Sequence, residues 1–150
     1  MRRMLSMSLA ALAIASAALP AMAGDSAYGT VKEVRAADVV LLAVGKTTYT
    51  VRLIGVLPPQ EGPLAQAARQ FVAQLVLGKH ARFYLYANVN GEYVAALLTD
   101  ADGDFRDVGV ELVRAGLARV VQNKFYKYGE LEAAEGEARQ RGRGMWAARP

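Results

Sequence analysis

The side chains best placed for chemistry form an acidic run, Asp100-Ala101-Asp102-Gly103-Asp104, with Glu111 at the twelfth place from its start. This order is typical of a calcium-binding loop between two helices, in which alternate carboxylates and a final glutamate hold the ion. The sixth place needs glycine for a sharp turn, but Phe105 stands there. We therefore expect a solvated turn with weak affinity for calcium.

The composition restricts other metal and nucleophile chemistry. The chain has no cysteine and one histidine, which excludes thiolate metal sites, a cysteine nucleophile and a multi-histidine centre. His80, at the start of an expected strand, is interpreted as structural. The chain also has no glycine-rich phosphate loop and no Gly-x-Ser-x-Gly elbow.

Hydrophobic residues make up 53% of the chain and charged residues 21%, which is typical of one globular domain with a real core. The formal charge is +4, and Arg2 and Arg3 supply two of these charges. The net charge that remains without them is too small to indicate nucleic-acid binding by itself. Lysines and tyrosines alternate at 124–128 and could stack bases, but neighbouring glutamates favour a solvated helix face. Further basic residues follow at Arg139, Arg141, Arg143 and Arg149.

Residues 1–23 have the pattern of an export signal. Arg2 and Arg3 form a positive head, Leu5–Leu19 carries no charge, and Ala21-Met22-Ala23 supplies a small-x-small cleavage pattern. The apolar segment is shorter than the roughly 20 residues that span a bilayer. We therefore expect cleavage before Gly24 and a single mature domain, residues 24–150. This domain would be exported to a bacterial periplasm or secreted, without membrane association.

Five strands and three helices are expected in the remaining chain. The strands are expected at Tyr28–Arg35, Val39–Val44, Thr48–Gly55, Arg82–Ala87 and Tyr93–Thr99. The helices are expected from Pro63 to Gly78, from Asp107 to Gly116 and over Gly129–Gln140, with the stripe Leu64, Ala68, Phe71, Leu75 facing the core. This order predicts an α+β fold, a five-stranded OB-fold-like β-barrel with three helices against it.

Four segments in sequence make the fold more specific. They are Val51–Val56 with Pro58 close behind, Leu75–Lys79, Glu111–Ala118, and a C-terminal set of Glu135, Ala138, Arg139, Gly144, Met145 and Trp146. In this order they resemble the staphylococcal nuclease (thermonuclease) family over nearly all of residues 28–147. The resemblance implies the SNase-like barrel. Active members of the family hydrolyse DNA and RNA phosphodiesters with one calcium ion, which two aspartates hold. Two arginines bind the phosphate, and a glutamate acts as the general base.

The resemblance also assigns roles to positions of this chain. Asp38 matches one calcium carboxylate, and Arg52 matches the first phosphate arginine. Leu57 stands at the second calcium carboxylate, Gln60 at the base and Glu92 at the second arginine. An apolar group cannot bind a hard cation, an amide cannot accept a proton near neutrality, and a carboxylate repels phosphate.

These replacements predict that the fold is retained without the catalysis, because loss of a general base alone costs about 10²–10⁴ in rate. We expect an exported thermonuclease-like binding module for single-stranded nucleic acid or a protein partner, monomeric and without a cofactor. The alternative is a calcium-dependent nuclease with a rebuilt site. In it, a one-residue insertion lets Glu61 act as the base beside Asp38 and Arg52.

Overall fold

The computed structural model describes residues 26–101, 103–122 and 129–148. The predicted export signal lies outside these residues, as do Asp102 and the lysines and tyrosines of the 124–128 segment. No helix within the described part of the chain is long and apolar enough to cross a membrane.

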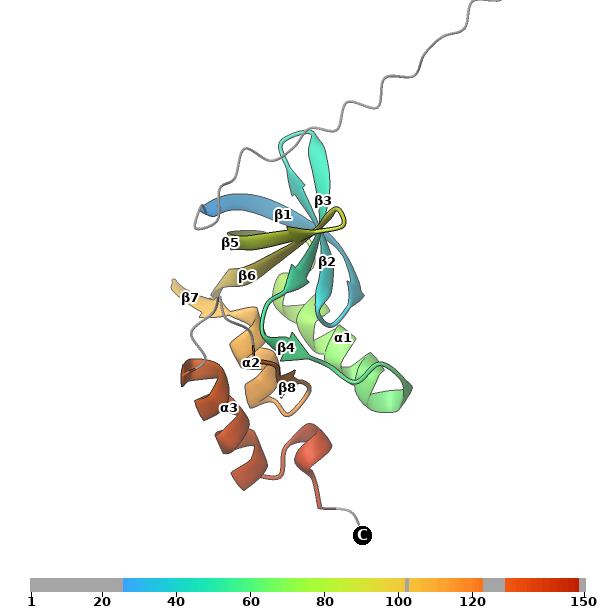
Figure 1. The fold of residues 1–150 in the computed structure, drawn as a ribbon, viewed down its shortest axis with the longest axis vertical. Helices are drawn as coiled ribbons and strands as arrows, with labels where there is room; N and C mark the ends of the chain where they lie inside the picture. Colours follow the sequence, from blue (N-terminus) through green and yellow to red (C-terminus); the bar gives the residue numbers. More distant parts are fainter. Residues whose placement is uncertain (1–25, 102, 123–128, 149–150) are drawn as a thin grey trace, which may run out of the picture.

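Strand pairings that are antiparallel except for one close a five-stranded barrel, as the sequence predicts (Figure 1). The strands run in the order β3-β2-β1-β5-β6, and a parallel pairing of β3 with β6 closes the ring. Their bounds are β1 Ser26–Ala36, β2 Val39–Val44, β3 Thr47–Leu53, β5 His80–Val89 and β6 Glu92–Ala101. Closure removes the exposed sheet edges that an open sheet of this size would present.

Three short strands were not predicted. Strand β7 (Asp104–Asp107) pairs with β6, while β4 (Val56–Leu57) pairs with β8 (Arg119–Val120) in a separate ribbon. The expected strand ending at Gly55 stops at Leu53, because Gly55 has a φ of 77° and turns the chain into β4. Strands this short show too little alternation to be recognised from the sequence.

Asp100 and Asp104, from the acidic run, lie on the paired strands β6 and β7 and not between two helices. Asp100 accepts a hydrogen bond from the backbone N–H of Gly103 at 2.9 Å, and it pairs in register with Phe105. Glu111 lies on the following helix and contacts Arg114. The described residues contain no group of three or more acidic or histidine side chains that could hold a metal ion.

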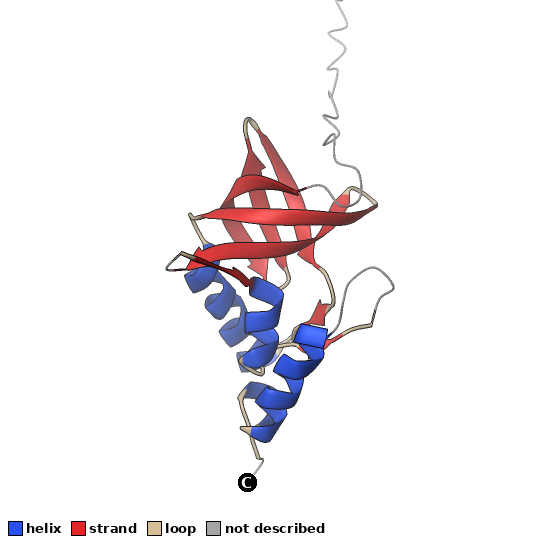
Figure 2. Ribbon diagram, turned by 90° about the vertical axis from the view of Figure 1, so that its left-hand side faces the viewer, coloured by secondary structure: helices blue, strands red, loops and turns tan. Residues whose placement is uncertain are grey.

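The helices gather at one end of the barrel (Figure 2). They are α1 Gly62–Val76, α2 Val108–Arg114 and α3 Gly129–Gln140, and a short 3-10 turn, η1 Gly144–Trp146, follows. Helix α1 starts with Pro63 at its first turn, and Asp107 caps α2 by accepting from the N–H of Val110 at 3.2 Å. Helix α1 buries Ala68 and Val72, but Leu64, expected in the core, is exposed near the start of the helix.

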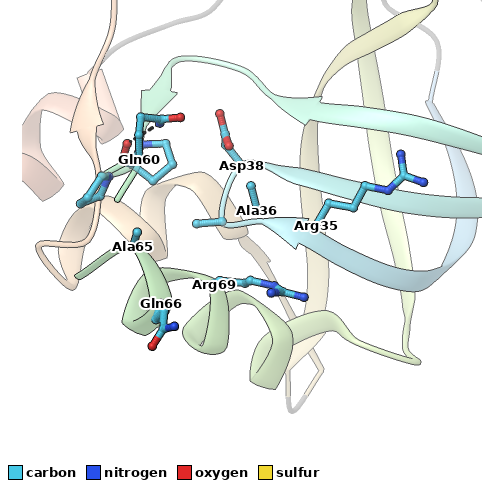
Figure 3. A pocket seen from close by; sticks show the side chains of 10 residues that line it. Arg35, Ala36, Asp38, Gln60, Ala65, Gln66 and Arg69 are labelled. Carbon is cyan, nitrogen blue, oxygen red and sulfur yellow. Dashed lines mark hydrogen bonds between the residues drawn. The ribbon is translucent and has the colours of Figure 1, made fainter. Parts of the chain in front are cut away.

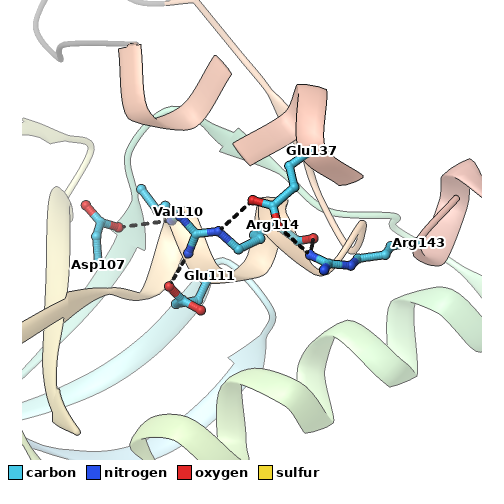
Figure 4. A network of polar contacts seen from close by, with 6 residues as sticks. All are labelled: Asp107, Val110, Glu111, Arg114, Glu137 and Arg143. Atoms are coloured by element: carbon cyan, nitrogen blue, oxygen red, sulfur yellow. Dashed lines mark hydrogen bonds and ion pairs between the residues drawn. The ribbon is translucent and has the colours of Figure 1, made fainter. Parts of the chain in front are cut away.

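Ionic contacts join α2 to α3 and to the C-terminal segment (Figure 4). The Glu137 carboxylate lies 3.3 Å from Nε of Arg114 and 3.4 Å from Nη1 of Arg143. Arg143 also donates to the backbone oxygen of Arg114 at 3.1 Å. These contacts join α3 to α2, and Leu112 of α2 and Leu131 of α3 are both fully buried in the same core.

The C-terminal segment is held through a close backbone approach between two glycines. The N–H of Met145 donates to the oxygen of Gly116 at 2.9 Å. A Cβ on Gly116 would lie 2.1 Å from the oxygen of Arg143, and one on Gly144 would lie 2.2 Å from the oxygen of Gly116. Both glycines have positive φ, so a larger residue would suffer a clash and a strained backbone.

Candidate functional site

Asp38 and Arg52 meet where the β1–β2 turn passes the end of β3. The backbone oxygen of Asp38 accepts from the N–H of Leu53 at 2.8 Å, which fixes the turn against β3. The Asp38 residue is only 4% exposed. Arg52 pairs with Val39 in the β2–β3 register, and its Nη1 donates to Oδ2 of Asp38 at 2.7 Å. Asp38 and Arg52, the two residues that match active-site positions of the nuclease family, thus form an ion pair with each other.

Glu92 reaches the same arginine from β6, the strand that pairs with β3. It starts β6 after a turn at Asn90-Gly91, both of which have positive φ, and the β3–β6 pairing brings it beside β3. Nε of Arg52 donates to Oε1 of Glu92, and Nη2 lies 3.4 Å from Oε2. The hydrogen bond with Glu92, followed by the charges of Asp38 and Glu92, raises the pKa of Arg52 against the opposing effect of burial. The cluster carries one more negative charge than positive.

The family's calcium ion does not fit the donors present. Leu57, at the second carboxylate position, lies on β4 with 49% of its surface exposed. Calcium takes about six to eight oxygen ligands, whereas the two carboxylates of this cluster, Asp38 and Glu92, both already accept from Arg52. This donor set therefore supports no reaction step through a bound calcium ion.

Gln60 and Glu61 occupy different environments. Gln60 lines a pocket with Asp38, and its Nε2 donates to the oxygen of Pro58 at 2.8 Å. Figure 3 shows Gln60 and Asp38 on the same side of this pocket, with α1 on the other. Glu61 precedes α1 as its N-terminal cap residue, is exposed, makes no capping hydrogen bond and is not among the residues that line the pocket. Of these two residues, Gln60 therefore shares the pocket with Asp38, and Glu61 does not.

A second, mostly apolar cleft extends from Arg52 over the outside of the barrel. Leu57, Val89 and Val121 line it and are among the most exposed large apolar residues of the described chain. Tyr86 of β5 also lines it, and burial, then the charge of Asp107, raises the pKa of its phenol. Sequence reasoning missed Tyr86, although alternation along β5 places it on the outward side. His80, at the other end of β5, is exposed.

The closed barrel, its three helices and this cleft define an OB-fold-like α+β domain. A family model described as "Staphylococcal nuclease homologue" matches residues 50–148. Since the match covers most of the chain, the chain belongs to the staphylococcal nuclease family, which confirms the resemblance and the fold expected from the sequence.

The curated relatives include fungal proteins named as probable endonucleases. "Probable endonuclease LCL3" of Pyricularia oryzae is 32% identical over 115 residues, which cover 68% of this chain and 45% of that protein. "Probable endonuclease lcl3" of Pyrenophora tritici-repentis is 33% identical over 115 residues, covering 68% of this chain and 42% of that protein. The chain thus spans less than half the length of these relatives.

Proposed function

We propose that this chain is a non-hydrolysing member of the nuclease family, which acts as an exported binding module. The observation that carries the proposal is the position of Arg52 between the carboxylates of Asp38 and Glu92. A phosphate would have to displace both carboxylates before it could use this guanidinium. The excess negative charge of the cluster opposes that exchange.

The replaced residues support the same proposal. Leu57 offers no oxygen to a metal ion, and the amide of Gln60 offers no proton acceptor to an attacking water. Glu92 reverses the charge that would stabilise the transition state, and removal of one such positioned donor alone costs about 10²–10³ in rate. Losses of this size act together on one reaction, so little hydrolysis is expected to remain.

The lining of the cleft favours a different ligand from a phosphodiester. Its apolar wall of Leu57, Val89 and Val121 lies beside a neutralised arginine. Exposed apolar clusters of this kind favour contact with apolar side chains, so a protein segment is the preferred occupant of the cleft. The charged head and the small-residue cleavage pattern of residues 1–23 support export.

The second candidate is a calcium-dependent nuclease that uses Asp38, Arg52 and Glu61. The names of the fungal relatives favour it, because they are called endonucleases. It requires Glu61 to move from the exposed start of α1 into the pocket that Gln60 now lines.

The two candidates are separated by a cleavage assay with single-stranded DNA and RNA in the presence of calcium. We expect the purified chain to cleave no faster than its Asp38→Ala variant. The triple variant Leu57→Asp, Gln60→Glu, Glu92→Arg should gain at least about 10² in rate, because it restores a base and a phosphate donor. Calcium-dependent cleavage that Asp38→Ala and Glu61→Gln both abolish would instead establish the second candidate.

A further inference from the structure

The outward side of β1 and β5 carries a group of aromatic and basic side chains outside the cleft. Tyr28 on β1 lies directly opposite Arg82 on β5 in the antiparallel register, and Tyr84 is two residues further along β5. The guanidinium carbon of Arg82 is 5.7 Å from the ring centre of Tyr28 and 4.8 Å from that of Tyr84. We call these three residues the tyrosine–arginine face.

This face is partly open to solvent, since Tyr28 is exposed and Arg82 and Tyr84 are half-buried. The alternate residues of β5, Ala81, Phe83 and Leu85, are buried inside the barrel, so Arg82 and Tyr84 point outward. Tyr28 is 56% exposed, as is Val89, the highest fraction among the large hydrophobic residues that the structure describes. Figure 2 shows this side of the barrel, with β1, β5 and β6 one below another and the helices gathered beneath them.

Within the part of the chain that the structure describes, no carboxylate pairs with Arg82. Its Nη2 donates to the hydroxyl of Ser26 at 3.0 Å, and none of the ion pairs formed among the described residues includes it. This distinguishes Arg82 from Arg52, which two carboxylates hold. The face therefore combines aromatic rings with a positive charge that remains available to an anion.

We propose that the tyrosine–arginine face binds single-stranded nucleic acid. Proteins that bind single strands without sequence preference combine aromatic rings, on which bases stack, with cations that contact the phosphates. Tyr28 and Tyr84 supply rings, and Arg82 between them supplies the cation for a neighbouring phosphate. A duplex keeps its bases stacked on each other and offers no base face to these rings, so the single strand is the favoured form.

The site is separate from the cleft, and the inference does not depend on whether the cleft hydrolyses phosphodiesters. Tyr86 continues the outward side of β5 from Tyr84 to the cleft. A strand on the tyrosine–arginine face would therefore run toward the cleft without needing Arg52. A protein segment in the cleft and a strand on this face could occupy the domain together.

The test is fluorescence anisotropy with a labelled oligothymidylate of about ten nucleotides, a length within the range that one OB fold covers. EDTA is included, so that calcium and cleavage do not contribute. We expect Tyr28→Ala and Tyr84→Ala each to weaken binding roughly 5- to 150-fold. Tyr28→Phe should keep most of the affinity, because the ring that stacks is retained. Phe105→Ala is the matched control, since that ring is 51% exposed on β7.

The charge is tested by the salt dependence of the same binding. Arg82→Gln should reduce the slope of log affinity against log salt by about 0.7, the value for one phosphate contact in a single strand. The control Arg106→Gln, on exposed β7, should leave the slope unchanged. Circular dichroism of each variant checks that the barrel is folded.

Several results would overturn the inference. They are no binding by the folded chain, equal loss in Tyr28→Ala and Phe105→Ala, or equally tight binding of the duplex. Loss of binding in Arg52→Met with full binding in Tyr28→Ala would place the strand in the cleft. That result would reject this face while leaving the question of hydrolysis to the cleavage assay.

Discussion

Replacing Arg52 with methionine should destabilise the fold, because it leaves the buried Asp38 carboxylate without its cation. Asp38 is 4% exposed and lies 2.7 Å from Nη1 of Arg52. Breaking a fully buried ion pair costs about 3–5 kcal/mol. The Arg52 side chain is 44% exposed, so solvent screens part of this loss. We expect the free energy of unfolding to fall by about 2 kcal/mol.

Glu92→Gln is the matched perturbation on the other side of the same arginine. The Glu92 side chain is 31% exposed, and partly exposed ion pairs contribute about 0–1 kcal/mol. This variant should therefore lose clearly less stability than Arg52→Met. Adding Asp38→Asn to Arg52→Met removes the unpaired charge and should recover about 1 kcal/mol, which a double-mutant cycle measures as coupling.

The assay is urea unfolding at neutral pH, followed by the fluorescence of Trp146, the single tryptophan of the chain. The pKa of Arg52 is raised above its ordinary value. The stability that its charged guanidinium contributes is therefore complete below the ordinary pKa and would be lost only as the pH rose through the pKa of the folded state. The reasoning is refuted if Arg52→Met loses no more stability than Glu92→Gln. Arg52 would then not be committed to Asp38 and would be available to a phosphate.

Two further predictions concern the cleft and the C-terminal segment. Burial, then the charge of Asp107, raises the pKa of the Tyr86 phenol above its ordinary value of 10.0. The stability that depends on the neutral phenol is therefore complete below pH 10 and is lost as the pH rises from there through the pKa of the folded state. Tyr86→Phe should remove the late-ionising component from an ultraviolet titration, and an unchanged titration curve would contradict this. Gly116→Ala should cost at least about 2 kcal/mol, since it adds a clash to a positive φ. An unchanged melting temperature would show that the backbone contact is dispensable.

The sequence predicted the longer elements of the fold correctly. The strand Val39–Val44 and the helix Gly129–Gln140 have the expected bounds. A β-branched apolar run between turn residues indicates the strand, and Gly142 and Gly144 mark where the helix has ended. The two-residue strands β4 and β8 give no such signal and depend on contacts between distant segments. Leu64 fits the helical stripe of α1 but is exposed near the start of the helix, because a periodic stripe does not show how far along the helix the core extends.

The sequence alone determined which donors and acceptors the site can offer, since the side-chain types at Leu57, Gln60 and Glu92 fix their chemistry wherever the chain folds. Only the tertiary structure decided what these groups contact. Closure of the barrel through β3 and β6 brings Glu92 against Arg52, and the register of β1 with β5 sets Tyr28 over Arg82. Pairing of strands far apart in the chain depends on the packing of the whole core, which no local pattern specifies.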